Sequence, residues 1–403
     1  MGKALELLSP AGDTERLIMA VTYGADAVYL AGSRFGMRAA AGNFDHYQMK
    51  NAVEMCHSRG VRVYVTCNSV MHNAEARDIP AFMEQLGDTK ADAVIVSDVG
   101  VMAMAKRYAP KLEIHISTQA GIANYETARA FYDMGASRAI LARELTLDEI
   151  AEIRAKTPPE LELEAFAHGA MCVSFSGRCL LSSYMAGRDA NRGACAQPCR
   201  WKYRIVEEKR PGEYMEITED GGTYIMNSRD MCMIEHLGEM MDAGVSSVKI
   251  EGRMKSAYYA AAVTNAYRHA IDAALAGEKP AKVWIDEMDK VSHRPYSTGF
   301  YFSAEGPGQH YGDAHYYTEY DVVAQVETCT EDGDAVLTQR NKFSVGETVE
   351  LLSPDGEPVN FTVERMQNAD GEDIESAPHP MMELKLKLPR CAPKYSFLRR
   401  KRA

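Results

Sequence analysis

The chain has 403 residues, of which 46% are hydrophobic and 25% are charged, and its formal net charge is −12. This composition is typical of a folded soluble protein, and the acidic balance argues against indiscriminate binding of nucleic acid. The sequence has no run of about 18 apolar residues and no amino-terminal signal-peptide core, so we expect a cytoplasmic protein without membrane spans.

One pattern repeats over residues 1–280: a short β-branched run, a polar or glycine-rich turn, and an amphipathic helix. Runs with strand character lie at residues 6–8, 27–30, 62–66, 93–96, 113–116, 138–141, 162–167 and 247–250. Strands that alternate with helices pair in parallel, and eight of them predict an α/β fold closed into a (β/α)₈, TIM-like barrel. An open doubly wound sheet is the rival, but the sequence has no dinucleotide-binding fingerprint.

The seventh repeat is interrupted, because about 80 residues separate the seventh strand from the eighth, where a loop and one helix suffice. We therefore expect a barrel domain at 1–290 with a cysteine-rich insertion after strand 7, at about 170–243. A turn-rich linker is predicted at 291–318. Strand runs at 320–328, 335–339, 348–352, 359–363 and 382–388, broken by Asp-Gly turns, predict a small β-barrel at 319–403.

Five cysteines cluster in the insertion, and a cytoplasmic protein rarely uses them as disulfides. They are Cys172, Cys179, Cys195, Cys199 and Cys232. Thiolates are soft ligands that suit zinc or an iron–sulfur cluster, and the spacing is neither that of a zinc ribbon nor that of a ferredoxin. The arginines nearby favour an anionic cluster, but zinc and unligated thiols remain open alternatives.

Polar side chains follow the predicted strands, and in a barrel these strand ends share the face where barrel enzymes build their sites. Helix capping and turn chemistry account for some of them but not for the arginines, which suit a carboxylate or phosphate substrate. We expect substrate binding by Arg38, Asn43, Gln119 and Arg143, and catalysis by His168, Glu251 and Arg253. A lone histidine is a weak signal, but His168 lies four residues before Cys172.

Two blocks depart from the acidic average: residues 172–204 hold six basic residues and one acid, and residues 385–402 hold eight basic residues and no acid. The basic tail, Arg399, Arg400, Lys401 and Arg402, predicts contacts with RNA phosphates, with Tyr395 and Phe397 stacking on a base. The alternative is a disordered, solubilising end.

Several motifs resemble one known family over the whole length of the chain. They are ELLSPAGD at 6–13, YGADAVYLAG at 23–32, HGAMCVSFSGRCLLS at 168–182, RDANRGACAQPCRWKY at 188–203, MNSRDMCMI at 226–234, VKIEGRMKS at 248–256 and YSTGFYF at 296–302. The chain resembles the collagenase-like peptidase family U32 and, within it, the tRNA hydroxylation proteins.

This resemblance implies a tRNA-modifying enzyme that hydroxylates C5 of the wobble uridine and depends on prephenate, a small dicarboxylate. Relatives in ubiquinone biosynthesis imply a [4Fe–4S] cluster on Cys172, Cys179, Cys195 and Cys232, with Cys199 as an alternate ligand. A peptidase and a non-catalytic iron–sulfur scaffold of a hydroxylase complex are the alternatives. The sequence has no recognisable protease nucleophile or zinc-protease motif, and it does not indicate the oligomeric state.

Overall fold

The computed structural model of the protein describes residues 5–37, 42–201, 205–206, 214–215, 228–306 and 316–402. Within these residues, eight parallel strands close into the predicted barrel, since the last strand pairs with both the first and the seventh. The barrel strands are β1 (Glu6–Pro10), β2 (Ala27–Ala31), β3 (Arg62–Cys67), β4 (Ala93–Val96), β5 (Glu113–Ile116), β6 (Arg138–Ile140), β7 (Glu162–Ala170) and β11 (Ser247–Ile250).

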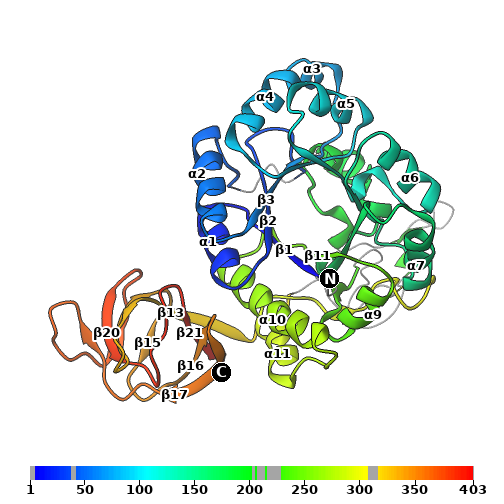
Figure 1. The fold of residues 1–403 in the computed structure, drawn as a ribbon. Helices are drawn as coiled ribbons and strands as arrows, with labels where there is room; N and C mark the ends of the chain where they lie inside the picture. Colours follow the sequence, from blue (N-terminus) through cyan, green and yellow to red (C-terminus); the bar gives the residue numbers. More distant parts are fainter. Residues whose placement is uncertain are drawn as a thin grey trace.

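Helices form a ring around these strands (Figure 1). They are α1 (Thr14–Thr22), α2 (His46–His57), α3 (Asn73–Ala76), α4 (Ile79–Thr89), α5 (Val99–Tyr108), α6 (Tyr125–Asp133), α7 (Leu147–Lys156), α9 (Leu237–Asp242), α10 (Ala257–Leu275) and α11 (Lys282–Asp286). Sequence features fix their starts: Asp13 and Ser256 cap α1 and α10, and Thr146 forms a capping box with Glu149 at α7. In the described part of the chain, none of the helices combines the length and apolar character needed to span a membrane.

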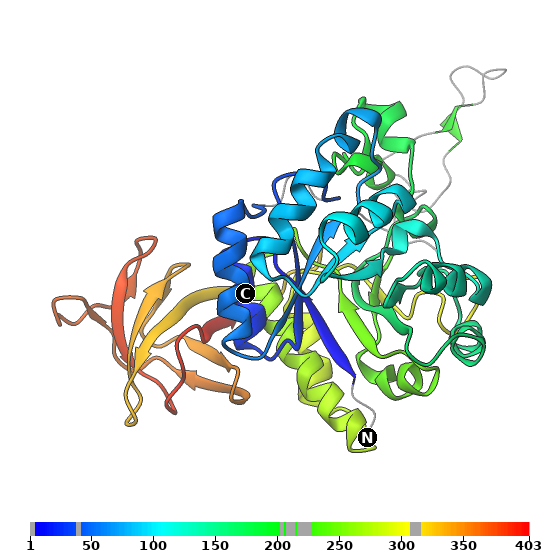
Figure 2. The same cartoon turned by 45° about the horizontal axis from the view of Figure 1, so that its top comes forward.

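The predicted insertion begins where β7 ends, and its described part folds into short elements at the carboxyl end of the barrel. These are the 3₁₀ turns η2 (Phe175–Gly177), η3 (Ala190–Arg192) and η4 (Pro198–Arg200), helix α8 (Leu181–Ala186), and strands β8 (Ile205–Val206), β9 (Tyr214–Met215) and β10 (Asp230–Cys232). Figure 2 shows these green elements rising from the top of the barrel, while the C-terminal domain lies beside its wall. Strand β10 runs antiparallel to the end of β7.

The segment expected to be a linker packs on the barrel instead of spanning free space. Strand β12 (Tyr296–Ser297) pairs with β10, and Arg294 is fully buried in an ion pair with Asp230, with Nη2 2.6 Å from Oδ1. A buried guanidinium needs a charged partner, which fixes the chain here. The described residues of this segment therefore belong structurally to the barrel domain.

The C-terminal part is an antiparallel β domain at the predicted place, and among the described residues no pairing of β17 with β18 closes its main sheet into a barrel. Its strands are β13 (Tyr320–Cys329), β14 (Asp334–Gln339), β15 (Phe343–Ser344), β16 (Thr348–Ser353), β17 (Gly356–Thr362), β18 (Gln367–Asn368), β19 (Ser376–Ala377), β20 (Glu383–Lys387) and β21 (Phe397–Lys401). The main sheet has the order β17-β16-β21-β13-β14-β20-β18. The two predicted Asp-Gly turns connect β13 to β14 and β16 to β17.

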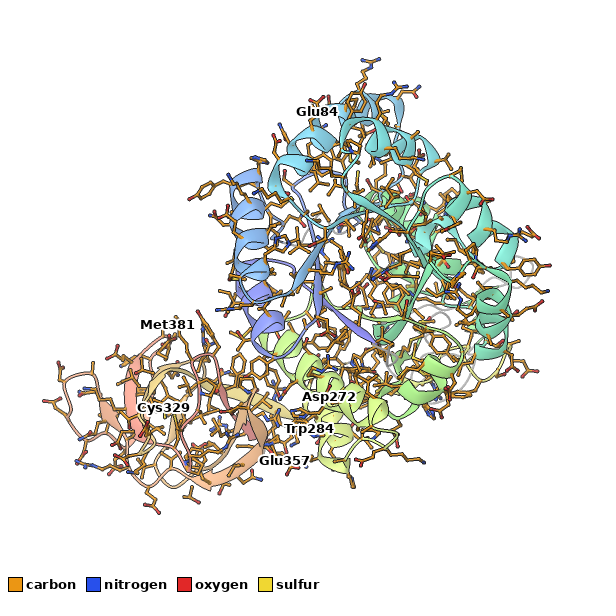
Figure 3. All side chains as sticks on the ribbon, in the orientation of Figure 1. Glu84, Asp272, Trp284, Cys329, Glu357 and Met381 are labelled. Carbon is orange, nitrogen blue, oxygen red and sulfur yellow. The ribbon has the colours of Figure 1, made fainter. Side chains whose placement is uncertain are left out.

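The C-terminal domain packs against α1, α10 and the 3₁₀ turn η6 (Glu287–Lys290), on the outer wall of the barrel. Tyr23, the residue that directly follows α1, donates a hydrogen bond from its hydroxyl to the carbonyl oxygen of Tyr395, 3.1 Å away. Arg399 of β21 reaches Glu287 of η6, with 2.6 Å between Nη2 and Oε1. Side chains fill this boundary in Figure 3, where Trp284 and Glu357 mark its two sides.

The amino-terminal half of the barrel interior holds an ion-pair network that the sequence pattern did not predict. Arg138 is 1% exposed, and its Nη1 lies 2.6 Å from Glu6 Oε1 and 3.1 Å from Glu164 Oε2. Glu164 also accepts a hydrogen bond from Lys249 Nζ at 2.9 Å. Each buried charge thus has an opposite partner, so the interior tolerates the cost of desolvating these groups.

Candidate active site at the barrel mouth

A small cavity opens at the carboxyl ends of the barrel strands, where the polar strand ends were expected to meet. Its polar lining includes Asn68, Gln119, Arg143, Lys249, Glu251 and Arg253. The cavity volume is about 60 Å³, which is room for a few water molecules or for one end of a larger ligand. Four of the seven residues predicted to bind substrate or to take part in catalysis line this cavity: Gln119, Arg143, Glu251 and Arg253.

Arg143 presents a guanidinium to this cavity. Its Cζ lies 3.9 Å from the centre of the Phe166 ring, and its Nη1 donates a hydrogen bond to the carbonyl oxygen of Ala170 at 3.0 Å. Nη2 is 3.9 Å from Glu251 Oε2, at the limit of an ion pair. The buried Nε has no hydrogen-bond partner among the described residues. A buried donor without a partner is costly, and an anionic ligand at this place would satisfy it.

Arg253 is 3% exposed and connects two strand ends. Its Nη1 donates to Thr66 Oγ1 at 3.3 Å, and its Nη2 donates to Asn43 Oδ1. Asn43 thus acts through Arg253 and is not part of the cavity lining. Arg38, the fourth residue expected to bind substrate, lies outside the described residues.

Two glycines of the sequence motifs let the loops approach the site this closely. A Cβ on Gly12 would lie 2.2 Å from the carbonyl oxygen of Arg253. Gly169 has a φ of +107°, and its Cβ would lie 2.4 Å from the carbonyl oxygen of Glu251. No other residue fits either position without a backbone shift, which explains why glycine stands there.

The side-chain amides of Asn68 and Gln119 add hydrogen-bond acceptors to the donors that the arginines provide. Asn68 Oδ1 and Gln119 Oε1 are buried acceptors without a hydrogen-bond partner in the described structure. Both line the cavity, as does Lys249, whose Nζ lies 4.4 Å from the Tyr29 ring centre. The mouth thus offers cations for an anion and acceptors for a hydroxyl or N–H group. Lys249 was missed as a site residue, although it lies two positions before Glu251, which directly follows β11, and residues two apart in an extended chain point to the same side.

His168, predicted to be catalytic, does not line the cavity. The pairing of β11 with β7 shifts register between Lys249 and Ile250, so His168 turns toward α10 instead of the barrel axis. Its Nδ1 is 3.4 Å from the Tyr267 hydroxyl, and its ring packs against three tyrosines. Burial lowers the pKa of His168 to about 3, so the ring is neutral near pH 7 and lacks the imidazolium proton that a general acid would donate.

Four of the five cysteines, Cys172, Cys179, Cys195 and Cys199, lie in the described part of the insertion that precedes β8. Burial raises the pKa of the Cys199 thiol, and the thiols of Cys172, Cys195 and Cys179 raise it further. Cys232 lies on β10 opposite His168 of β7, where its Sγ is 3.9 Å from the Tyr267 hydroxyl and burial raises its pKa to about 11. Within the described ranges, no three Cys, His, Asp or Glu side chains are arranged as metal ligands.

The tail does not form the RNA-binding arm that the sequence predicted. Residues Phe397–Lys401 are strand β21, which lies between β13 and β16 within the sheet. Arg399 is fully buried between Glu287 and Glu350, and Phe397 is 3% exposed. For these two residues the prediction was wrong, because buried groups cannot reach phosphates or bases.

The other three tail residues are paired with acids. Arg400 pairs with Glu347, Lys401 with Glu319 and Arg402 with Asp321. These acids come from other strands of the domain or from the residues that lead into it, and they neutralise the basic run that stands out in the sequence. The tail is therefore neither a free basic patch nor a disordered end.

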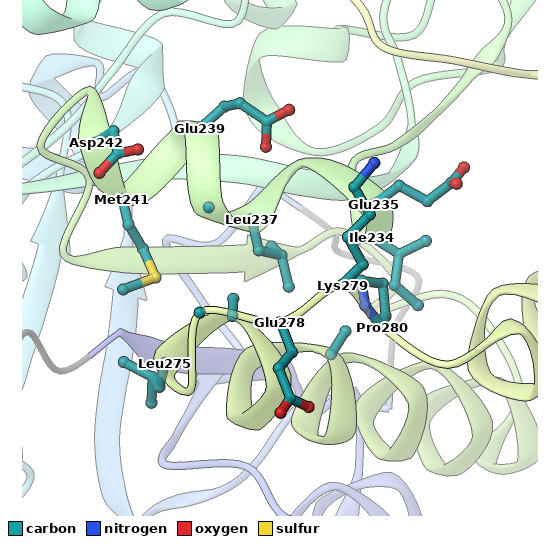
Figure 4. A pocket seen from close by; sticks show the side chains of 14 residues that line it. Ile234, Glu235, Leu237, Glu239, Met241, Asp242, Leu275, Glu278, Lys279 and Pro280 are labelled. Atoms are coloured by element: carbon teal, nitrogen blue, oxygen red, sulfur yellow. The ribbon is translucent and has the colours of Figure 1, made fainter.

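A larger cavity of about 780 Å³ lies elsewhere, between α9 and the end of α10 (Figure 4). Its charged lining is mostly acidic, since Glu235, Glu239, Asp242 and Glu278 face a single basic side chain, Lys279. An anionic ligand would be repelled there. The smaller cavity at the barrel mouth is therefore the better candidate for a dicarboxylate.

Fold and site together define a TIM-like barrel protein with a polar mouth beside a cysteine-bearing insertion, followed by an antiparallel β domain. The chain belongs to peptidase family U32. Its residues 12–310 match the sequence profile of that family, and residues 318–399 match the profile of the U32 C-terminal domain. The resemblance drawn from the motifs is thereby confirmed.

The relatives that align with the chain carry different names. The chain is 38% identical over 391 residues to tRNA hydroxylation protein P1 of Bacillus subtilis (strain 168), covering 96% of this chain and 92% of that protein. It is 37% identical over 415 residues to tRNA hydroxylation protein P of Escherichia coli (strain K12), covering 93% and 91%. A collagenase of Porphyromonas gingivalis (strain ATCC BAA-308 / W83) is 35% identical over 309 residues, covering 73% of each chain.

Proposed function

We propose that this protein is a tRNA-modifying enzyme that hydroxylates C5 of the wobble uridine in a prephenate-dependent reaction. Two relatives aligned over more than nine-tenths of this chain are named as tRNA hydroxylation proteins. The observation that carries the proposal is the barrel mouth, where Arg143, Arg253 and Lys249 converge on one cavity. Barrel enzymes build their sites at this face.

The basic side chains at the mouth would hold a dicarboxylate. Arginine matches a carboxylate with two parallel hydrogen bonds, and the unsatisfied Nε of Arg143 provides one donor. The unsatisfied oxygens of Asn68 and Gln119 suit a hydroxyl group, which prephenate also carries. The cavity volume of about 60 Å³ is smaller than such a ligand, so part of it would extend toward the mouth.

We further propose that the insertion binds a [4Fe–4S] cluster through Cys172, Cys179 and Cys195, with Cys199 or Cys232 as the fourth ligand. The donor set fits the group chemically, because thiolates are the ligands that iron–sulfur clusters take and all five of these cysteines lie in one insertion. Such a cluster carries single electrons when it is bound. The arginines around these cysteines would offset its negative charge.

Iron content tests the cluster. Protein purified without air should be brown, absorb broadly near ~400 nm and contain about four iron atoms per chain. Replacing Cys172, Cys179 or Cys195 with alanine should remove most of this iron. Cys391→Ala should retain it, because Cys391 is an exposed thiol of the C-terminal domain. The fourth ligand is whichever of Cys199→Ala and Cys232→Ala loses the iron. Colourless protein with one tightly bound zinc ion would refute the cluster.

Peptidase is the second candidate, favoured by the family name and by the collagenase relative. In the described part of the chain, each side-chain hydrogen bond of a histidine goes to a carboxylate, a tyrosine or a carbonyl oxygen, and none goes to a serine or cysteine nucleophile. Anaerobically purified protein should therefore leave denatured collagen intact.

The proposed function is tested by comparing tRNA nucleosides from strains with and without the gene by mass spectrometry. We expect the 5-hydroxyuridine nucleosides to disappear with the gene. Unchanged nucleosides together with degradation of denatured collagen would favour the peptidase. If the protein is a non-catalytic scaffold, the strain without the gene would also lack the nucleosides, but the purified protein would carry a hydroxylase partner in stoichiometric amount.

A further inference from the structure

The cysteine-bearing insertion exposes large apolar side chains that proteins normally bury. Tyr184 of α8 is 80% exposed, Leu180 is 57%, Phe175 is 52% and Trp201 is 42%. We call the described segment 175–201 the insertion surface. Exposed aromatic rings gathered on one short segment indicate a place where a partner binds.

The same segment carries arginines whose charges are not offset. Arg178 Nε donates to the carbonyl oxygen of Gln119 at 2.6 Å, and Arg188 Nε donates to that of Ala194 at 3.0 Å. Arg200 Nη1 donates to the Tyr316 hydroxyl at 2.9 Å. In the described residues these guanidinium groups contact neutral oxygens, whereas each basic residue of the tail has a carboxylate partner.

The acids near the insertion surface do not cancel this charge. Asp189, the one acid between residues 175 and 201, uses its carboxylate to cap a turn by accepting from the backbone N–H of Asn191 at 2.9 Å. Glu75 pairs with Arg192, and the Glu144 carboxylate accepts from the backbone N–H and the hydroxyl of Ser176. Among the described residues, no carboxylate forms an ion pair with Arg178, Arg188 or Arg200. The surface thus combines net positive charge with exposed rings.

Contacts with three barrel loops hold the insertion surface beside the candidate active site. Arg178 contacts Gln119, which lines the cavity, and the backbone N–H of Ser176 donates to Glu144 Oε1 at 2.6 Å. The backbone N–H of Val70 donates to the carbonyl oxygen of Asn191 at 3.0 Å. Figure 2 shows the insertion above the barrel, away from the C-terminal domain. A polymer bound here would reach the cavity.

We infer that the insertion surface binds the unpaired nucleotides of an RNA loop, with Arg178, Arg188 and Arg200 on phosphates and Tyr184 and Trp201 stacked against bases. Aromatic rings beside arginines suit single-stranded RNA, because every base has a face to stack and every nucleotide has a charge. One unstacked nucleotide would then enter the barrel mouth. The inference rests on the proposed function and places its RNA site on the insertion surface, whereas the sequence had predicted this site at the basic tail.

A salt series tests the electrostatic part. The full-length protein, purified without air, is titrated with an unmodified tRNA transcript at increasing salt. Changing Arg178, Arg188 and Arg200 to glutamine should reduce the slope of log affinity against log salt by about two units, since each lost phosphate contact removes about 0.7. The matched control changes Arg400, Lys401 and Arg402 to glutamine and should leave the slope as in the wild type.

A second triple variant, with lysine in place of Arg178, Arg188 and Arg200, separates lost charge from a damaged fold. It should keep the wild-type slope, because lysine also neutralises a phosphate. If the glutamine and lysine variants reduce the slope of log affinity against log salt equally, the three arginines do not act by neutralising phosphates. A flatter slope in the tail variant alone, or no change in any variant, would overturn the RNA site.

The stacking part is tested with single aromatic changes. Tyr184→Ala should weaken binding of the transcript about tenfold, as expected for one lost base stack. Tyr47→Ala is the control, because Tyr47 is 72% exposed on α2, outside the insertion. Equal affinities of the two variants would exclude Tyr184 from the RNA site. Wild-type affinity in every variant of the insertion surface, together with loss of the hydroxylated nucleosides in the strain without the gene, would refute the RNA site and leave the proposed function intact.

Discussion

Arg399→Ala is expected to lower the free energy of unfolding by roughly 3–5 kcal/mol, because it leaves two buried carboxylates with Lys290 as their one remaining cationic partner among the described residues. Arg399 is fully buried, and its guanidinium lies 2.6 Å from Glu287 and 2.7 Å from Glu350. Arginine also keeps the pKa of Glu287 below its usual value, against the opposing effect of burial. Urea denaturation followed by circular dichroism measures the loss.

Arg400→Ala is the matched control for this experiment. Arg400 is the next residue of β21, but its side chain is 30% exposed and pairs with the half-buried Glu347. A pair that water reaches contributes little, so we expect a loss below about 1 kcal/mol. Equal losses for the two variants would mean that the buried network does not join the C-terminal domain to the barrel.

Arg143→Met is expected to weaken prephenate binding by a factor of at least ~30, the effect of removing one partner of a buried charge pair. Methionine retains much of the side-chain volume but no donor. Arg143 is a sharper test than Arg253, because Arg253 also holds Asn43 and Thr66 in place. Calorimetric titration measures the affinity, and iron content should not change.

Arg143→Lys controls for charge at the same position. Lysine keeps the positive charge but loses the planar pair of donors, so its affinity should lie between those of the wild type and the methionine variant. If Arg143→Met binds prephenate as tightly as the wild type does, Arg143 does not contact the ligand. If the wild-type protein does not bind prephenate, the proposal that the barrel mouth holds this dicarboxylate is wrong.

The barrel could be predicted because its signals are local. Each strand is a short β-branched run, and each helix start carries its own cap, such as Asp13 or the Thr146–Glu149 box. Strand ends that share one face then brought Gln119, Arg143, Glu251 and Arg253 together without any knowledge of distances.

The tail could not be predicted in this way, because its partners are distant in sequence. Glu350 and Glu287 lie 49 and 112 residues from Arg399, so a basic run looked like an exposed end although it is a central strand. The turn of His168 away from the cavity had a similar cause, since it depends on a register shift between β7 and β11 that leaves no local signal. Long-range pairing decided both outcomes.

The central claim, that the barrel mouth serves hydroxylation of tRNA, is tested most directly in a strain that lacks the gene and is resupplied with single variants. Mass spectrometry of its tRNA nucleosides should find 5-hydroxyuridine derivatives restored by the wild type and by Cys391→Ala, and absent with Arg143→Met. Full restoration by Arg143→Met, or unchanged nucleosides in the strain without the gene, would contradict the account.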